Sequence, residues 1–189
     1  MSISCSILGG RERVCKTTVG GCKTLFLGLH SVFAAGVTTG GTNQMVNDLP
    51  EGTLYRFEVG GSLSALNLVS NITSSPENGT VFYAQTITAK FPKLTALDRQ
   101  NFMNIAASQL VAFVLDNNNN IHMVGKVNAA DVTGGENGNT GNAMGDMAGY
   151  TLTILANEPE PPNILQPFTT NPFDNFADIT ISPAYPVVS

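Results

Sequence analysis

The order of apolar and polar residues along the chain predicts a series of short β-strands. In residues 53–59, Tyr55, Phe57 and Val59 alternate with charged residues and would share one face, the pattern of a half-buried strand. Residues 110–115 are apolar throughout, which predicts a strand that is buried on both faces. Comparable patterns predict strands at residues 24–29, 65–72, 80–91, 121–125 and 150–155. The pattern as a whole indicates a mostly-β fold, either a β-sandwich or a barrel.

Two strand pairs are joined by residues that favour tight turns. Pro76-Glu77-Asn78-Gly79 lies between two predicted strands, and Asn-Gly tolerates the positive φ that such turns need. Residues 116–120, one aspartate and four asparagines, predict a second hairpin. The strand at 80–91 is longer than most, which favours an arm or hairpin that extends past the body of the protein.

One segment predicts a helix, at about residues 96–107. Thr95 and Asp98 have the spacing of a capping box, with Asp98 near the positive end of the helix. Apolar residues recur at roughly helical spacing at Leu94, Leu97, Phe102 and Ile105. The Gly-, Thr- and Asn-rich residues 36–52 predict a loop, and the Gly-rich residues 128–149 predict a long flexible loop.

The C-terminal region combines proline with large apolar side chains. Seven of the ten prolines follow Glu158, which excludes a regular helix or a central strand there. We therefore expect three regions: a basic segment at 1–23, a β-domain at 24–157 and an extended arm at 158–189. The arm would dock on the surface of its own chain or of a neighbour. Its candidate residues for an oligomer interface are Phe168, Phe173, Phe176, Ile179 and Tyr185.

Composition narrows the class of protein. The chain has 189 residues, of which 42% are hydrophobic and only 12% charged, about half the usual charged share. Cys5, Cys15 and Cys22 form an odd, clustered set, which argues against a disulfide framework. The sequence shows neither a signal peptide nor an apolar run of membrane-spanning length, so we expect folding in a reducing cytoplasm and no membrane.

Charge is distributed unevenly along the chain. The formal net charge is −5, and no lysine or arginine follows Lys126. The acids Asp131, Glu136 and Asp146 lie beyond that point and are candidates for an acidic channel or stacking surface. Arg11, Arg13 and Lys16 near the start of the chain are candidates for a basic stacking partner. The alternative is that the acidic region simply keeps the protein soluble.

Residues that could carry chemistry are sparse. The chain has two histidines, His30 and His122, and the spacing of the three cysteines and His30 fits no common zinc site. Phosphate-binding, serine-hydrolase and calcium-loop signatures are missing from the sequence. We therefore expect no enzymatic activity, no metal and no cofactor.

The order of elements resembles that of the tail tube and tail-ring (collar) proteins of bacteriophages, particularly phages that infect Bacteroidetes. The resemblance covers about residues 20–157. It rests on the predicted strand order, on the Gly-Thr-x-x-Tyr pattern that starts at Gly79, on the single helix, and on the Gly-Tyr-x-Leu pattern that starts at Gly149.

This resemblance implies a virion structural protein that assembles in the host bacterial cytoplasm into a ring, hexameric or twelve-fold, or a tube. Such a ring would contact neighbouring tail or neck proteins and let DNA pass without binding it specifically. An acidic channel wall suits that task because it offers phosphates no cation. A surface-binding β-sandwich, such as a capsid decoration or adhesin-like protein, is the alternative.

Overall fold

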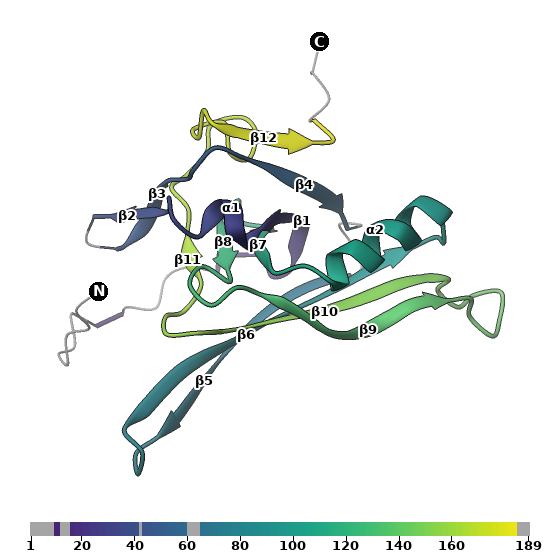
Figure 1. The fold of residues 1–189 in the computed structure, drawn as a ribbon, viewed down its shortest axis with the longest axis horizontal. Helices are drawn as coiled ribbons and strands as arrows, with labels where there is room; N and C mark the ends of the chain where they lie inside the picture. The colour runs from purple at the N-terminus through teal and green to yellow at the C-terminus, as the bar shows by residue number, and fades with distance from the viewer. Residues whose placement is uncertain (1–9, 12–15, 42, 60–64, 185–189) are drawn as a thin grey trace.

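The protein is built mostly from β-strands, as the sequence predicts (Figure 1). The computed structural model describes residues 10–11, 16–41, 43–59 and 65–184. Its elements are β1 (Cys22–Leu29), α1 (His30–Phe33), β2 (Thr38–Gly40), β3 (Met45–Asp48), β4 (Gly52–Glu58), β5 (Leu66–Ser75), β6 (Thr80–Pro92), α2 (Ala96–Ala106), β7 (Leu110–Asp116), β8 (Ile121–Val124), β9 (Asp131–Asn139), β10 (Gly149–Glu158), β11 (Asn163–Ile164) and β12 (Ile179–Ser182). Within these described ranges, α2 is the only helix longer than a single turn.

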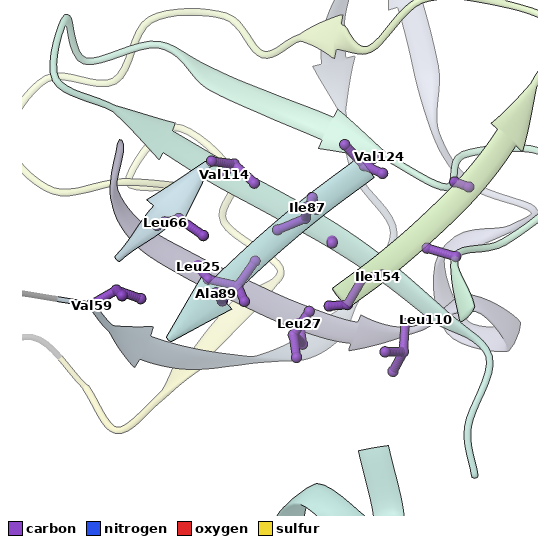
Figure 2. Close-up of a cluster of buried hydrophobic side chains, with 13 residues drawn as sticks. Leu25, Leu27, Val59, Leu66, Ile87, Ala89, Leu110, Val114, Val124 and Ile154 are labelled. Atoms are coloured by element: carbon purple, nitrogen blue, oxygen red, sulfur yellow. The ribbon is translucent and has the colours of Figure 1, made fainter. Parts of the chain in front are cut away.

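Two large sheets pack face to face. The first has the strand order β11-β8-β7-β1-β4-β12 and the second β5-β6-β10-β9, while β2 and β3 form a small separate sheet. Between the large sheets lies a cluster of buried aliphatic side chains (Figure 2), including Leu25 and Val114 from the first sheet and Ile87 and Ile154 from the second. The arrangement is a β-sandwich closed by hydrophobic burial.

The six-stranded sheet is buried on its other face as well. Residues alternate along β7, so that Ala112 and Val114 enter the cluster between the sheets while Val111 and Phe113 face away from it. Those two side chains belong to a second cluster, which is covered by Phe33 of α1 and by residues of the small sheet and the C-terminal region. The prediction that 110–115 is buried on both faces is confirmed.

Residues 159–184, here called the C-terminal strap, complete the second cluster. The strap adds β11 to the edge of β8 and runs β12 parallel to β4 at the opposite edge of the same sheet. Both are edge strands, the positions that a proline-rich segment can occupy. The strap therefore docks on its own chain.

Two of the predicted interface residues are core residues. Phe173 and Phe176 are 3% and 5% exposed, and the Phe173 ring lies edge-on to Phe26 and Phe113, with centroids 5.0 and 5.4 Å away. Phe173 keeps this place despite a φ of 69°, a conformation unfavourable for a bulky side chain. A neighbouring subunit could not reach these two side chains. Phe168 and Ile179 pack partly buried against the same cluster, and Tyr185 lies outside the described residues.

Two segments expected to be loops contain strands. Residues 36–52 form β2 and β3, and residues 128–149 contain β9, which pairs with β10. Gly135 in β9 has a φ of 135°, and a Cβ at that position would collide with the Thr151 carbonyl oxygen of β10. The absence of a side chain at Gly135 thus permits β9 to pair closely with β10. The Gly-rich composition that predicted a loop therefore belongs to an edge strand.

Two predicted faces are buried only in part. The Thr95 side chain accepts a hydrogen bond from Asp98 N at 3.1 Å, so Thr95 is the N-cap of α2. Leu97, however, is 71% exposed, and α2 packs through Phe102 and Ile105 instead. In β4, Phe57 and Val59 of the predicted face pack in the cluster between the sheets, but Tyr55 is exposed, and Leu54 on the opposite side enters the second cluster.

We expect Phe173→Ala to lower the free energy of unfolding by about 3–5 kcal/mol, because it leaves a cavity between Phe26 and Phe113. The control is Leu97→Ala, which truncates a side chain that is 71% exposed and should cost about 1 kcal/mol or less. Urea denaturation of both variants, followed by far-UV circular dichroism, measures the difference. Equal losses would mean that the strap is not part of the core.

Candidate assembly interface

Strands β5 and β6 form a hairpin that leaves the body of the protein (Figure 1). Ten residue pairs join the strands without a register shift, from Leu66 opposite Ala89 to Ser75 opposite Thr80. The turn at 76–79 ends at Gly79 with a φ of 63°, which suits glycine. The prediction that the long strand extends past the body as a hairpin is confirmed. We call residues 69–84 the overhang.

The face of the hairpin that lines the core carries apolar side chains again beyond the body, after one polar pair, Ser70 and Gln85. Leu68 and Ile87, which are opposite each other, pack in the cluster between the sheets. Farther out on that same face follow Ile72, opposite Tyr83, and then Val81. Ile72 is 69% exposed and Val81 49%, since the six-stranded sheet does not cover the overhang. Exposed apolar side chains thus lie on the core-lining face beyond the body, and the six-stranded sheet does not cover them.

The overhang carries almost no charge. Glu77 in the turn is its one ionisable side chain, apart from the phenol of Tyr83, and its other polar residues are serine, threonine and asparagine. On the outer face, Val69 and Phe82 are also exposed. A surface that combines apolar groups with hydroxyls and amides can be dehydrated at lower cost than a charged one.

The predicted acidic residues lie together on one edge of the four-stranded sheet. Asp131 and Glu136 are exposed on β9, and Asp146 is exposed in the loop that joins β9 to β10. The pKa of Asp146 lies below its usual value because its carboxylate accepts hydrogen bonds from the N–H groups of Ala143 and Asn142. These three carboxylates thus share one edge of the molecule.

The predicted basic residues lie elsewhere. Arg11 and Lys16 are exposed, and Arg13 is outside the described residues. In Figure 1 the short purple segment of residues 10–11 lies at the left of the molecule, while the β9–β10 loop lies at the right end. The basic and acidic candidates are therefore well separated within one chain.

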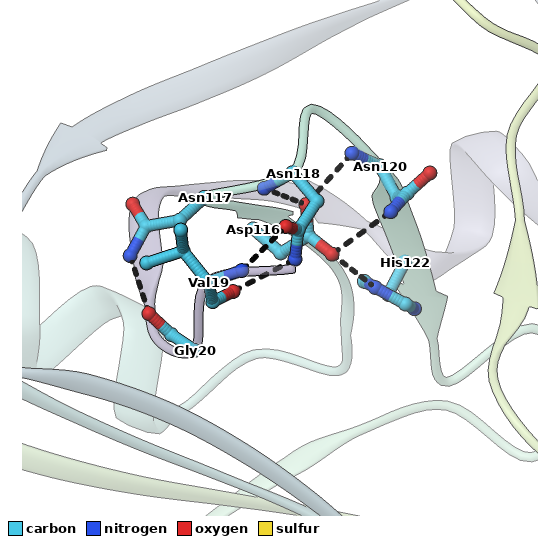
Figure 3. A network of polar contacts seen from close by, with 7 residues as sticks. All are labelled: Val19, Gly20, Asp116, Asn117, Asn118, Asn120 and His122. Atoms are coloured by element: carbon cyan, nitrogen blue, oxygen red, sulfur yellow. Dashed lines mark hydrogen bonds and ion pairs between the residues drawn. The ribbon is translucent and has the colours of Figure 1, made fainter. Parts of the chain in front are cut away.

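A network of asparagine side chains holds residues 19–21 against the β7–β8 turn (Figure 3). The Asn118 amide both donates to the carbonyl of Val19 and accepts from its N–H, at 2.8 and 2.9 Å, as a neighbouring strand would. Asn117 adds a hydrogen bond from its side chain to the Gly20 carbonyl at 2.7 Å. These contacts fix the point where the basic segment enters β1.

Asp116 organises that turn. Its carboxylate accepts hydrogen bonds from the backbone N–H groups of Asn118 and Asn120 and from the Asn120 amide, and His122 Nε2 is 3.4 Å away. Burial acts to raise the pKa of Asp116, but these hydrogen bonds outweigh it, and the pKa lies below its usual value. His122 is thus a structural partner of the turn.

A second carboxylate is buried beside the start of the strap. Glu158 is almost fully buried and accepts hydrogen bonds from Val127 N and Asn128 N at 2.8–3.1 Å. Burial raises its pKa. Both contacts tie β10 to the chain after β8, so this carboxylate has a structural role.

A groove of about 490 Å³ lies between α2 and the edge of the four-stranded sheet. Phe102 and Met103 line it from the helix, and Val132 and Leu152 line it from the sheet. Glu136 stands among the lining residues. No group of three or more histidine, cysteine, aspartate or glutamate residues in the described ranges is arranged to hold a metal. Neither helix there has the length and apolar character of a membrane span.

The structure defines the class of the protein as a β-sandwich with one substantial helix. No protein-family model matches the chain, and no curated protein matches it in sequence.

We expect Asp116→Asn to lower the free energy of unfolding near neutral pH by about 1.5–3 kcal/mol, since hydrogen bonds to a charged acceptor are lost. Because the folded-state pKa is depressed, this stabilisation is present above the unfolded pKa and is lost as pH falls through the folded one. The gap between wild type and variant in thermal melts should therefore close in acid.

The control for the Asp116→Asn variant is Asn119→Gly. It keeps the positive φ of 63° at that position and removes only the contact to Lys23. It should follow the wild-type dependence on pH. A gap between wild type and Asp116→Asn that stays constant from neutral to acidic pH would contradict the role given to the carboxylate.

Proposed function

We propose that the protein is a virion structural protein that oligomerises into a ring or tube and forms part of a phage tail channel for genome passage. The overhang is the observation that carries the proposal. It exposes Ile72, Val81 and Phe82 on a long, regular hairpin with one charged residue at its turn. Exposed apolar side chains on both faces of a nearly uncharged hairpin favour a protein–protein contact there.

Element order adds to the argument. The resemblance to tail tube and tail-ring proteins rests on strand order and on one helix before a buried strand. The observed order of β6, α2, β7 and β8 agrees with that expectation. A subunit whose contact surfaces lie at different places can form a heterologous contact, which closes into a ring or continues as a filament.

The charge distribution favours a channel for DNA. No lysine or arginine follows Lys126, and Asp131, Glu136 and Asp146 share one exposed edge. If that edge faces the lumen, phosphates find no cation to hold them, and DNA can slide. If it faces the next ring instead, it meets the basic segment with Arg11 and Lys16, and charge fixes the register of stacking.

We expect light scattering of the purified protein to give a mass well above 19.9 kDa, and negative-stain microscopy to show rings or tubes with a central hole. Val81→Asp should weaken assembly at least about tenfold, because a charge replaces an apolar side chain that the contact would bury. Asn78→Asp is the control, since it adds the same charge in the turn without removing apolar surface.

Far-UV circular dichroism should show both variants folded. Assembly that Asn78→Asp disrupts as strongly as Val81→Asp would mean that charge at the hairpin end, and not lost apolar surface, is the cause.

We expect wild-type assemblies not to retain duplex DNA in filter-binding assays, and Asp131→Lys/Glu136→Lys to bind it with an affinity that falls steeply with salt. The neutral pair Asp131→Asn/Glu136→Gln separates added cations from lost anions. If the lysine pair retains no more DNA than the neutral pair, this edge does not line a channel.

A surface-binding β-sandwich is the second candidate, and the groove beside α2 favours it. Its walls are largely apolar, with Glu136 among the lining residues, a mixture found in ligand sites. A monomer at high concentration would favour this candidate over the ring.

A further inference from the structure

The edge of β5 that faces away from β6 carries backbone N–H and C=O groups that pair with no other strand in the described part of the chain. In the described part of the chain, β5 pairs with β6 alone. Lys90 N donates to the Ala65 carbonyl oxygen at 2.7 Å, and these two residues stand opposite each other at the base of the hairpin. Since inward and outward hydrogen bonding alternate along an antiparallel strand, the even-numbered residues of β5 direct their N–H and C=O groups to the free edge.

Two residues limit this edge. At the inner end, the backbone of Leu68 is already engaged by a hydrogen bond with the Cys22 side chain of β1. At the outer end, Pro76 has no N–H to donate. The residues left open are Ser70, Ile72 and Ser74, and Ile72 is the midpoint between the two limits.

The same edge lacks the features that protect exposed strands. From Leu66 to Ser75 there is no charged residue, no proline and no register shift. The opposite edge of the same sheet, strand β9, does have such protection. It carries two charged residues, Asp131 and Glu136, and its pairing with β10 has two irregularities. Natural sheets use such charges and bulges to prevent edge pairing, so the unprotected β5 edge is suited to a partner strand.

We propose that two copies of the chain pair their β5 strands edge to edge, antiparallel, about a two-fold axis at Ile72. Ser70 of each copy then lies opposite Ser74 of the other, and the three residue pairs exchange about six backbone hydrogen bonds. On the core-lining face, Ile72 meets Ile72 of the second copy between the two Tyr83 rings, which gives a continuous apolar stripe across four strands.

A second copy fits this edge better than an unrelated strand does. The open residues Ser70, Ile72 and Ser74 are symmetric about Ile72. Two antiparallel copies of β5 therefore match in length, and each begins and ends at the same residues. No like charges face each other, because Glu77 of one copy lies opposite Asn67 of the other. The two-fold contact goes beyond the proposed ring: it joins two copies by itself, and in a ring it would join two rings back to back.

Disulfide trapping tests the register. In a background with Cys5, Cys15 and Cys22 changed to serine, Ile72→Cys places two thiols at the axis, where the Cα separation of about 5.5 Å permits a disulfide. Thr73→Cys is the matched control, since residue 73 lies opposite residue 71 of the other copy. Mild oxidation should convert Ile72→Cys to covalent dimer at least about tenfold faster than Thr73→Cys.

Non-reducing gels report the yield, and microscopy of the same samples reports the rings. Rings or dimers in which Ile72→Cys is not trapped, or in which Thr73→Cys is trapped faster, overturn the Ile72-centred pairing and leave the proposed function standing. Trapped dimers without rings support the pairing and count against the ring. A protein that stays monomeric and untrapped overturns both.

A backbone variant adds a readout that does not depend on cysteine. Ser70→Pro removes one outward N–H and leaves the hydrogen bonds to β6 in place, because residue 70 points to the free edge. It should raise the dimer dissociation constant at least about tenfold in sedimentation equilibrium, whereas Ser70→Ala should not. Equal constants for the two variants, both folded by circular dichroism, would exclude edge pairing.

Discussion

Strands β1 and β7 are apolar on both faces, and a sheet with two apolar faces must be covered on both sides. This requirement accounts for the three-layered construction. The four-stranded sheet covers one face through Ile87 and Ile154. The other face has no second large sheet, so it is covered by the short helix α1, the small β2–β3 sheet and the C-terminal strap. Phe173 and Phe176 are the buried aromatic side chains that the strap supplies.

The same requirement explains why the overhang is exposed. The four-stranded sheet is longer than the sheet it covers, and hydrophobic burial ends where the facing sheet ends. Beyond that point, Ile72 and Val81 keep the alternation of a core-lining face without anything to cover them. Inside the body this pattern stabilises one chain, whereas outside it the pattern can stabilise only a contact between chains.

Side-chain patterns predicted the strands in which one or both faces are buried. They identified 110–115 and the long strand at 80–91, whose length also predicted the hairpin. They missed β9, because backbone pairing with β10 and the space left by Gly135, not an apolar face, define that strand. They also missed the buried role of Phe173, since its partners Phe26 and Phe113 are far away in sequence.

The sequence predicted some residues of the candidate surfaces and not others, again because spatial partners far apart in the chain leave no local pattern. Charge counts identified Asp131 and Glu136, which lie on the same edge strand. The Asp116 turn and its contacts with residues 19–21 left no signal except a run of asparagines, because hydrogen-bond partners across about a hundred residues cannot be recognised from one sequence. The inner limit of the β5 edge likewise depends on Cys22, which only the fold brings close to Leu68.

The position of the strap in the chain has a consequence during synthesis. β1 emerges from the ribosome first and β12 near the end, yet both belong to one sheet. Until residues 173–182 have emerged, the rings of Phe26 and Phe113 have no Phe173 to cover them. The nascent protein therefore passes through a stage with one finished core and one open aromatic face, and at that stage it is most exposed to chaperones and to aggregation.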